Sequence, residues 1–185
     1  MAEGNGTSGH VLVTSKNAPQ LRPEVLGGMG AFSKLLKDNR QLPDRLVELM
    51  RLRIAFRNQC RDCMSMRYAS ALDDGLTEDL VCSIEKPSEP SDLTPQERAA
   101  VEFGDKFAGN HLSITAEDRL ALNEHFTPEQ IVELGILAAM FTGFGRFGAV
   151  FDTGDSLPVG DRHANGSALT PWGISDPIIM GVPAS

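Results

Sequence analysis

The chain of 185 residues has few cysteines, few aromatic residues and a deficit of basic residues. Three cysteines are too few, and odd in number, for a small scaffold held together by disulfides. Aromatic residues make up 6% of the chain, with one Trp and one Tyr, which argues against a base-stacking platform for nucleic acid. The net charge of −8 argues further against nucleic acid, because binding a polyanion requires a basic surface.

Long apolar runs are also missing from the sequence. None approaches the roughly 18 residues of a membrane-spanning helix, so we expect no transmembrane helix and no membrane partner. The N-terminal sequence MAEGNGTSGH has neither the basic nor the apolar region of a secretory signal. We therefore expect a cytoplasmic protein, and the length favours about one domain.

The composition divides the chain into three parts. Residues 1–22, rich in Gly, Ser, Thr and Asn, are predicted to form a flexible N-terminal arm, and residues 23–152 a helical domain. Residues 153–185, rich in Pro and Gly, are predicted to form an extended C-terminal tail. The apolar residues of this tail need a surface to lie on, such as a neighbouring subunit. Residues 86–92, KPSEPSD, are interpreted as a linker within the domain.

Hydrophobic periodicity predicts helices over residues 24–37, 43–58, 62–73 and 77–84. The helix at 43–58 is apolar around most of its circumference, which is typical of a buried helix. We find no alternating strand pattern and no glycine-rich phosphate loop. The sequence therefore predicts an all-α fold.

Three later helices have recognisable N-terminal capping sequences. Thr94, Thr115 and Thr127 are each followed three residues later by Glu, Asp or Gln, which is the pattern of a capping box. The last helix should run from Pro128 to about Val150. Its glycines would allow another helix to approach closely or would weaken its end: Gly135, Gly143, Gly145 and Gly148.

Cys60 and Cys63 form a C-x-x-C sequence at the start of the predicted helix 62–73. Backbone N–H groups and the helix dipole at that end favour a thiolate over a thiol. Arg67 should lie on the same helix face, four residues after Cys63, where its charge would lower the pKa of the thiol further. A pair of such thiols that can close a disulfide is typical of a thiol oxidoreductase.

Two other interpretations of this pair stay open. It could be half of a zinc site completed by His111 and His125, although no second pair follows at zinc-finger spacing, and we expect no metal and no cofactor. The two cysteines could also be buried and inert. The third cysteine, Cys82, is predicted to pack in the core, as buried cysteines commonly do.

Glu48 is the second candidate, because it is a carboxylate placed among apolar residues of the helix 43–58. It could form a salt bridge with Arg45 or Arg51, each three residues away. Alternatively it could accept a proton from the cysteines. A straight helix would separate Glu48 from Cys60 by about 18 Å, so the chain would have to turn near residues 57–59.

The stretch LVELMRLRIAFRNQCRDCMSMRYASAL, residues 46–72, resembles the carboxymuconolactone decarboxylase / alkylhydroperoxidase D-like family. The resemblance extends over about residues 20–152 and includes 97–108 and 129–152. The spacing from Glu48 to the cysteine pair is its most specific part. The resemblance implies an all-helical, alkylhydroperoxidase D-like bundle that assembles as a homotrimer or homohexamer.

The resemblance also implies roles for individual residues. Cys63 is expected to attack peroxide, Cys60 to resolve the sulfenic acid as a disulfide, and Glu48 to serve a proton relay. A thiol electron donor would then reduce the pair. Redox-active members usually have a His four residues after the second cysteine, whereas this sequence has Arg67, which holds charge but cannot act as a base.

Three functional hypotheses follow. The first is a thiol-dependent oxidoreductase that reduces a small peroxide or a disulfide, with Arg67 as electrostatic activator. The second is a non-redox lyase, isomerase or decarboxylase acting on a small carboxylated or carbonyl substrate, with Arg67 binding a carboxylate and Glu48 moving the proton. The third is an assembly protein in which the cysteines are inert.

Overall fold

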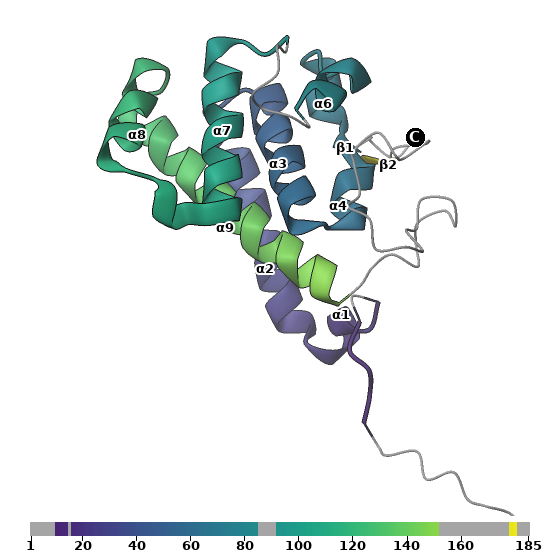
Figure 1. Cartoon of the computed structure of the whole chain (residues 1–185). Helices are drawn as coiled ribbons and strands as arrows, with labels where there is room; N and C mark the ends of the chain where they lie inside the picture. Colours follow the sequence, from purple (N-terminus) through teal and green to yellow (C-terminus); the bar gives the residue numbers. More distant parts are fainter. Residues whose placement is uncertain (1–9, 15, 85–91, 152–177, 181–185) are drawn as a thin grey trace, which may run out of the picture.

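A computed structural model describes residues 10–14, 16–84, 92–151 and 178–180. The described residues form helices joined by short connections, so the predicted all-α fold is confirmed (Figure 1). The helices and strands are, in chain order, α1 (Ala18–Leu21), α2 (Pro23–Asp38), α3 (Asp44–Asn58), α4 (Arg61–Ser65), β1 (Met66–Tyr68), α5 (Ala69–Asp73), α6 (Glu78–Ser83), α7 (Pro95–Asn110), η1 (His111–Ser113), α8 (Ala116–Ala121), η2 (Leu122–Glu124), α9 (Pro128–Val150) and β2 (Ile178–Met180).

Helix α3 is the centre of the fold, packed against α7 and α9 (Figure 1). Its side chains Leu49, Met50, Leu52 and Ile54 are fully buried, as the apolar circumference of this segment predicts. Gly104 of α7 lies so close that an added Cβ atom would stand 2.6 Å from Cγ of Met50. The close approach of α7 thus depends on the absence of a side chain there.

The three predicted capping boxes are all present. The hydroxyls of Thr94, Thr115 and Thr127 accept hydrogen bonds from the backbone N–H groups three residues later, at 3.2, 3.1 and 3.3 Å. Each cap satisfies a backbone donor that has no partner inside the helix, and such a cap is typically worth about 1 kcal/mol. These local signals explain why α7, α8 and α9 begin where the sequence indicates.

The predicted helix over residues 62–73 is wrong. Helix α4 ends at Ser65, the strand β1 follows, and α5 begins at Ala69. The carbonyl of Cys63 accepts a hydrogen bond from Nη1 of Arg51 at 2.6 Å, and the carbonyl of Met64 accepts one from Nη1 of Arg67 at 2.7 Å. Because these carbonyls accept hydrogen bonds from guanidinium groups, they keep a partner although the helix ends here.

The parts outside the helical domain differ from expectation in two places. Helix α1 lies within the predicted N-terminal arm, and β2 within the predicted tail. Strand β2 pairs in parallel with β1, with Arg67 opposite Ile179. Most of the predicted linker, and Trp172 of the tail, lie outside the described residues.

Helix α9 is long and apolar enough to cross a membrane by length and composition alone, a test that a core helix can also meet. Within this chain α9 contributes Leu134, Leu137 and Ala138 to the core beside α3. Other apolar residues of α9 stay exposed, including Val132 and Val150. The helix therefore has one face in the core and apolar side chains on its outside.

Candidate active site

The chain reverses direction at the end of α3, as the separation of Glu48 and the cysteines requires. Gln59 adopts a left-handed conformation with φ 52° and ψ 35°. The backbone N–H of Cys60 then donates to the carbonyl of Ala55 at 3.2 Å, and Cys60 becomes the N-cap of α4. The predicted turn at residues 57–59 is confirmed, and it brings the cysteines back beside α3.

Cys60 and Cys63 are joined in a disulfide, with their Cα atoms 5.2 Å apart. Cys60 is only 1% exposed, and an added Cβ atom at Gly148 of α9 would lie 3.3 Å from its sulfur. Cys63 is partly exposed and lines a cavity. The two sulfurs therefore differ in access, with Cys63 toward the cavity and Cys60 beneath α9.

Glu48 is 2% exposed and forms a two-pronged ion pair with Arg51, with nitrogen–oxygen distances of 2.6 and 2.7 Å. It also accepts a hydrogen bond from the backbone N–H of Tyr68 at 3.2 Å. Of the two predicted partners, Arg51 is therefore the one that pairs with Glu48. Arg45 pairs with Glu97 instead.

Arg51 links the carboxylate to the cysteine loop. Besides Glu48, its guanidinium binds the carbonyls of Cys63 and Met66, at 2.6 and 2.7 Å. Burial lowers the pKa of Arg51, but the adjacent Glu48 carboxylate outweighs this effect and raises the pKa. Arg51 thus stays positively charged, with Glu48 on one side and the backbone of Cys63 on the other.

Arg67 does not stand on a helix with Cys63, because α4 ends at Ser65. Its side chain has no exposed surface, and its Nε and Nη2 atoms bind Glu78 at 2.9 and 3.0 Å. The same-face geometry on which its predicted role as an activator rests is therefore absent. Sequence reasoning weighed Arg51 as a partner of Glu48 and as a further cation for a substrate, and did not identify its contact with the cysteine loop.

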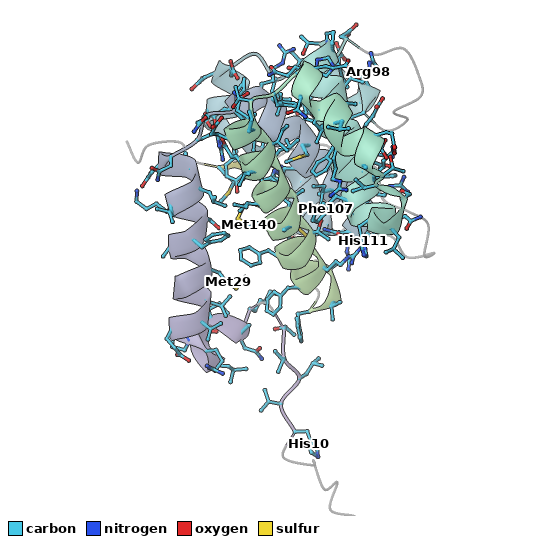
Figure 2. The ribbon with its side chains drawn as sticks, turned by 90° about the vertical axis from the view of Figure 1, so that its left-hand side faces the viewer. His10, Met29, Arg98, Phe107, His111 and Met140 are labelled. Carbon is cyan, nitrogen blue, oxygen red and sulfur yellow. A yellow bond between two sulfur atoms is a disulfide. The ribbon has the colours of Figure 1, made fainter. Side chains whose placement is uncertain are left out.

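Two neighbouring cavities, with volumes of about 220 and 160 Å³, share five lining residues: Ser33, Arg51, Tyr68, Met140 and Phe141. Because these residues lie between the two cavities, we describe both together as one cleft, with Glu48 on the wall of the larger cavity and Cys63 on the wall of the smaller. Figure 2 shows α2 standing beside α9, with Met140 between them. Sequence reasoning missed these walls, because they come from helices about 100 residues apart in the chain.

Within the described residues there is no cluster of three or more His, Cys, Asp and Glu side chains that could hold a metal ion. His111 begins η1 and His125 follows η2, whereas the cysteines lie at α4. Cys82 is partly buried on α6, next to the buried residues Leu80 and Val81. The third cysteine is therefore separate from the disulfide.

Comparison with known protein families finds a match over the segment that holds the candidate site. The family model of the carboxymuconolactone decarboxylase family matches residues 23–106, which include Glu48 and both cysteines of the pair. The chain is similar to this family over that segment. The resemblance predicted from the sequence is thus confirmed for the segment that holds the candidate site.

Individual relatives have no stated activity. An uncharacterised protein of Mycobacterium tuberculosis is 32% identical over 87 residues, covering 47% of this chain, and the match spans only 31% of that protein. The uncharacterised protein YdfG of Bacillus subtilis is 24% identical over 152 residues, covering 79% of this chain and 94% of YdfG.

A solved structure confirms the fold class. It is a protein of unknown function from Agrobacterium tumefaciens, provisionally named the antioxidant defence protein AhpD. It superposes with a TM-score of 0.67 at 23% identity, covering 74% of this chain and 94% of that one. The bundle is therefore alkylhydroperoxidase D-like.

Proposed function

We propose that this protein is a thiol-dependent oxidoreductase that reduces a peroxide through Cys63 and Cys60. The observation that carries the proposal is the unequal access of the two linked sulfurs. Cys63 lines the cleft, whereas Cys60 is buried against α9. In a dithiol peroxidase the attacking sulfur needs access to substrate, and the resolving sulfur needs only to reach its partner.

The proposed cycle has three steps. The Cys63 thiolate attacks one oxygen of the peroxide, the O–O bond breaks, and the other oxygen leaves as an alcohol or water after taking up a proton. Cys63 is thereby oxidised to a sulfenic acid. The Cys60 thiolate then attacks the Cys63 sulfur and releases water as the disulfide forms, and an external dithiol reduces the disulfide by thiol exchange.

Glu48 is the proposed acid/base group, and Arg51 the positioning residue. Glu48 lines the larger cavity, while Arg51 faces both cavities and holds the carbonyl of Cys63. This assignment gives Arg51 the place near the cysteine loop that the sequence suggested for Arg67. The negative charge of Glu48 partly neutralises the positive charge of Arg51. A proton that moved onto Glu48 would remove this neutralisation, so Arg51 would then stabilise a negative charge on Cys63 more strongly.

No observation favours the non-redox alternative, a lyase, isomerase or decarboxylase. It assigns Arg67 to a substrate carboxylate, with Arg51, Arg53 and Arg57 as further cations. The Arg67 guanidinium is fully buried and already bound to Glu78 and to backbone carbonyls. Arg67 therefore cannot take the role that this alternative gives it.

We also propose that several copies of the chain associate, as trimers or hexamers. The support is the apolar surface left open on one chain, since large exposed apolar areas commonly mark interfaces. Leu35 of α2 is 59% exposed, and Val132 and Val150 of α9 are 61% and 75% exposed. Light scattering during size-exclusion chromatography should give a mass of three or six chains, and a single-chain mass would refute this part.

The oxidoreductase proposal is tested by peroxide consumption in the presence of a dithiol. Cys63→Ser should abolish consumption, because the attacking sulfur is lost. Cys82→Ser is the matched control, since Cys82 lies on α6 outside the disulfide, and it should consume peroxide at the parent rate. Equal rates in Cys63→Ser and Cys82→Ser would refute the proposal.

A further inference from the structure

We propose that the cleft selects hydroperoxides that carry a carboxylate at the far end of an apolar body. This inference rests on the proposed function and names its substrate class. The inference rests on a difference between the two ends of the cleft in the side chains that line them. One end holds Cys63, and the other is lined by cationic side chains.

The larger cavity has four cationic side chains on its wall, Lys34, Lys37, Arg40 and Arg51, and two carboxylates, Asp44 and Glu48. Both carboxylates are already paired with arginines, Asp44 with Arg40 and Glu48 with Arg51. The wall is therefore positive on balance, although the whole chain has a net charge of −8. Such a local excess attracts an anion.

Donors at the cationic end of the cleft are not all engaged by protein groups within the described residues. The ammonium group of Lys37 has no hydrogen bond or ion pair with any residue that the structure describes, and that of Lys34 pairs there only with the exposed Asp38. The Nε atom of Arg40 is a buried donor without a partner in the described part of the chain. A neighbouring cavity has Asp73 and Asp74 on its wall, so the positively charged part of the surface ends on that side.

The middle of the cleft has the apolar side chains Met140 and Phe141 beside Arg51, whose charge is paired with Glu48. Ser33 of α2 donates to the sulfur of Met140 at 3.5 Å, and the backbone N–H of Gln41 donates to Glu133 at 3.0 Å. Helices α2 and α9 therefore run in opposite directions, and Met140 and Phe141 face the cleft between its two ends.

The helices also set its length. Gly145 lines the end with Cys63, and Lys37 the opposite end. From Gly145 to Met140 along α9, and on from Ser33 to Lys37 along α2, the helical rise gives a span of roughly 14 Å. That span fits a carboxylate, a chain of medium length and a terminal hydroperoxide.

In the bound substrate the carboxylate would lie between Lys37 and Arg40, and the hydroperoxide would reach Cys63. The reaction is the one proposed above: the Cys63 thiolate takes one peroxide oxygen, and the hydroxy acid leaves. A neutral ester of the same acid would fill the apolar part equally well but would lose the ionic contacts. The protein should therefore turn over the acid in preference to its ester.

The test compares the terminal hydroperoxide of octanoic acid with its methyl ester, measured as the ratio of the two kcat/KM values. The acid should be preferred, and added salt should reduce the preference. Lys37→Gln should lower the ratio roughly fivefold, the effect of one partly screened ion pair, and Lys34→Gln/Lys37→Gln should lower it further. Lys106→Gln is the control, because Lys106 pairs with Asp118 on α8 and does not line this cleft.

A second readout does not depend on turnover. Octanoate should bind the oxidised protein more tightly than octanol in a calorimetric titration, and Lys37→Gln should reduce this difference. An unchanged ratio and unchanged octanoate binding in Lys37→Gln would overturn the inference, even in an active peroxidase. Octanoate binding that depends on Lys37, in a protein that consumes no hydroperoxide, would support the anion site and refute the proposed function.

Discussion

The Glu48–Arg51 ion pair should be the most sensitive polar contact in the protein. Both side chains are nearly inaccessible, at 2% and 6% exposure, so replacing Arg51 by Met would leave a carboxylate buried without its cation. Breaking a buried pair in this way typically costs about 3–5 kcal/mol. The carbonyls of Cys63 and Met66 would lose their guanidinium donors at the same time. Because small domains have roughly 5–15 kcal/mol of total stability, Arg51→Met should come close to unfolding the protein.

The assay is urea unfolding followed by circular dichroism. Arg57→Met is the matched control, because Arg57 is 43% exposed and pairs with Asp105 at the surface, where a pair is worth at most about 1 kcal/mol. The double variant Glu48→Gln/Arg51→Met should lose less than the sum of the two single losses, since both single changes break the same contact. A loss in Arg51→Met no larger than in Arg57→Met would refute the reasoning.

Two further predictions concern packing and acid stability. Gly145→Ala should cost about 1–3 kcal/mol, because the new Cβ atom would lie 2.5 Å from Nδ2 of Asn58. Gly143→Ala, on the same helix but with open space around it, should gain up to about 1 kcal/mol, and urea midpoints that fail to separate the two variants would contradict this account. Burial raises the pKa of Asp105, but the hydrogen bonds and charges of Arg57 and Arg53 together outweigh burial and hold the pKa below its ordinary value. The resulting stabilisation is present above about pH 4, the ordinary value for Asp, and is lost as the pH falls through the lowered pKa. Asp105→Asn should therefore flatten the acid side of a plot of urea midpoint against pH, and an unchanged slope would count against this assignment.

The features that sequence reasoning predicted correctly are mostly local ones. Thr94, Thr115 and Thr127 begin helices because the capping residue and its partner are three positions apart, and no distant contact is needed. The burial of α3 follows from its own apolar circumference. The turn before Cys60 was predicted from spacing, because a straight helix could not have brought Glu48 near the cysteines.

The features that sequence reasoning missed depend on contacts between distant segments. The helix after Cys63 ends early because Arg51, twelve residues back on α3, donates to the Cys63 carbonyl. Periodicity within residues 62–73 has no information about that donor. In the same way β2 pairs with β1 across more than half of the chain, and no alternating pattern predicted it. The prediction for Arg67 rests on a continuous helix after Cys63 and on the position of the usual His of the family, and the helix does not continue that far.

The central claim is that Cys63, and not Cys60, is the sulfur that peroxide oxidises. The most direct test treats the reduced Cys60→Ser variant with one equivalent of peroxide and the sulfenic acid reagent dimedone, and locates the adduct by mass spectrometry. With no resolving thiol, the sulfenic acid should persist and one adduct per chain should appear at Cys63. Absence of an adduct at Cys63, or an adduct at Cys60 in the reciprocal Cys63→Ser variant, would contradict the account.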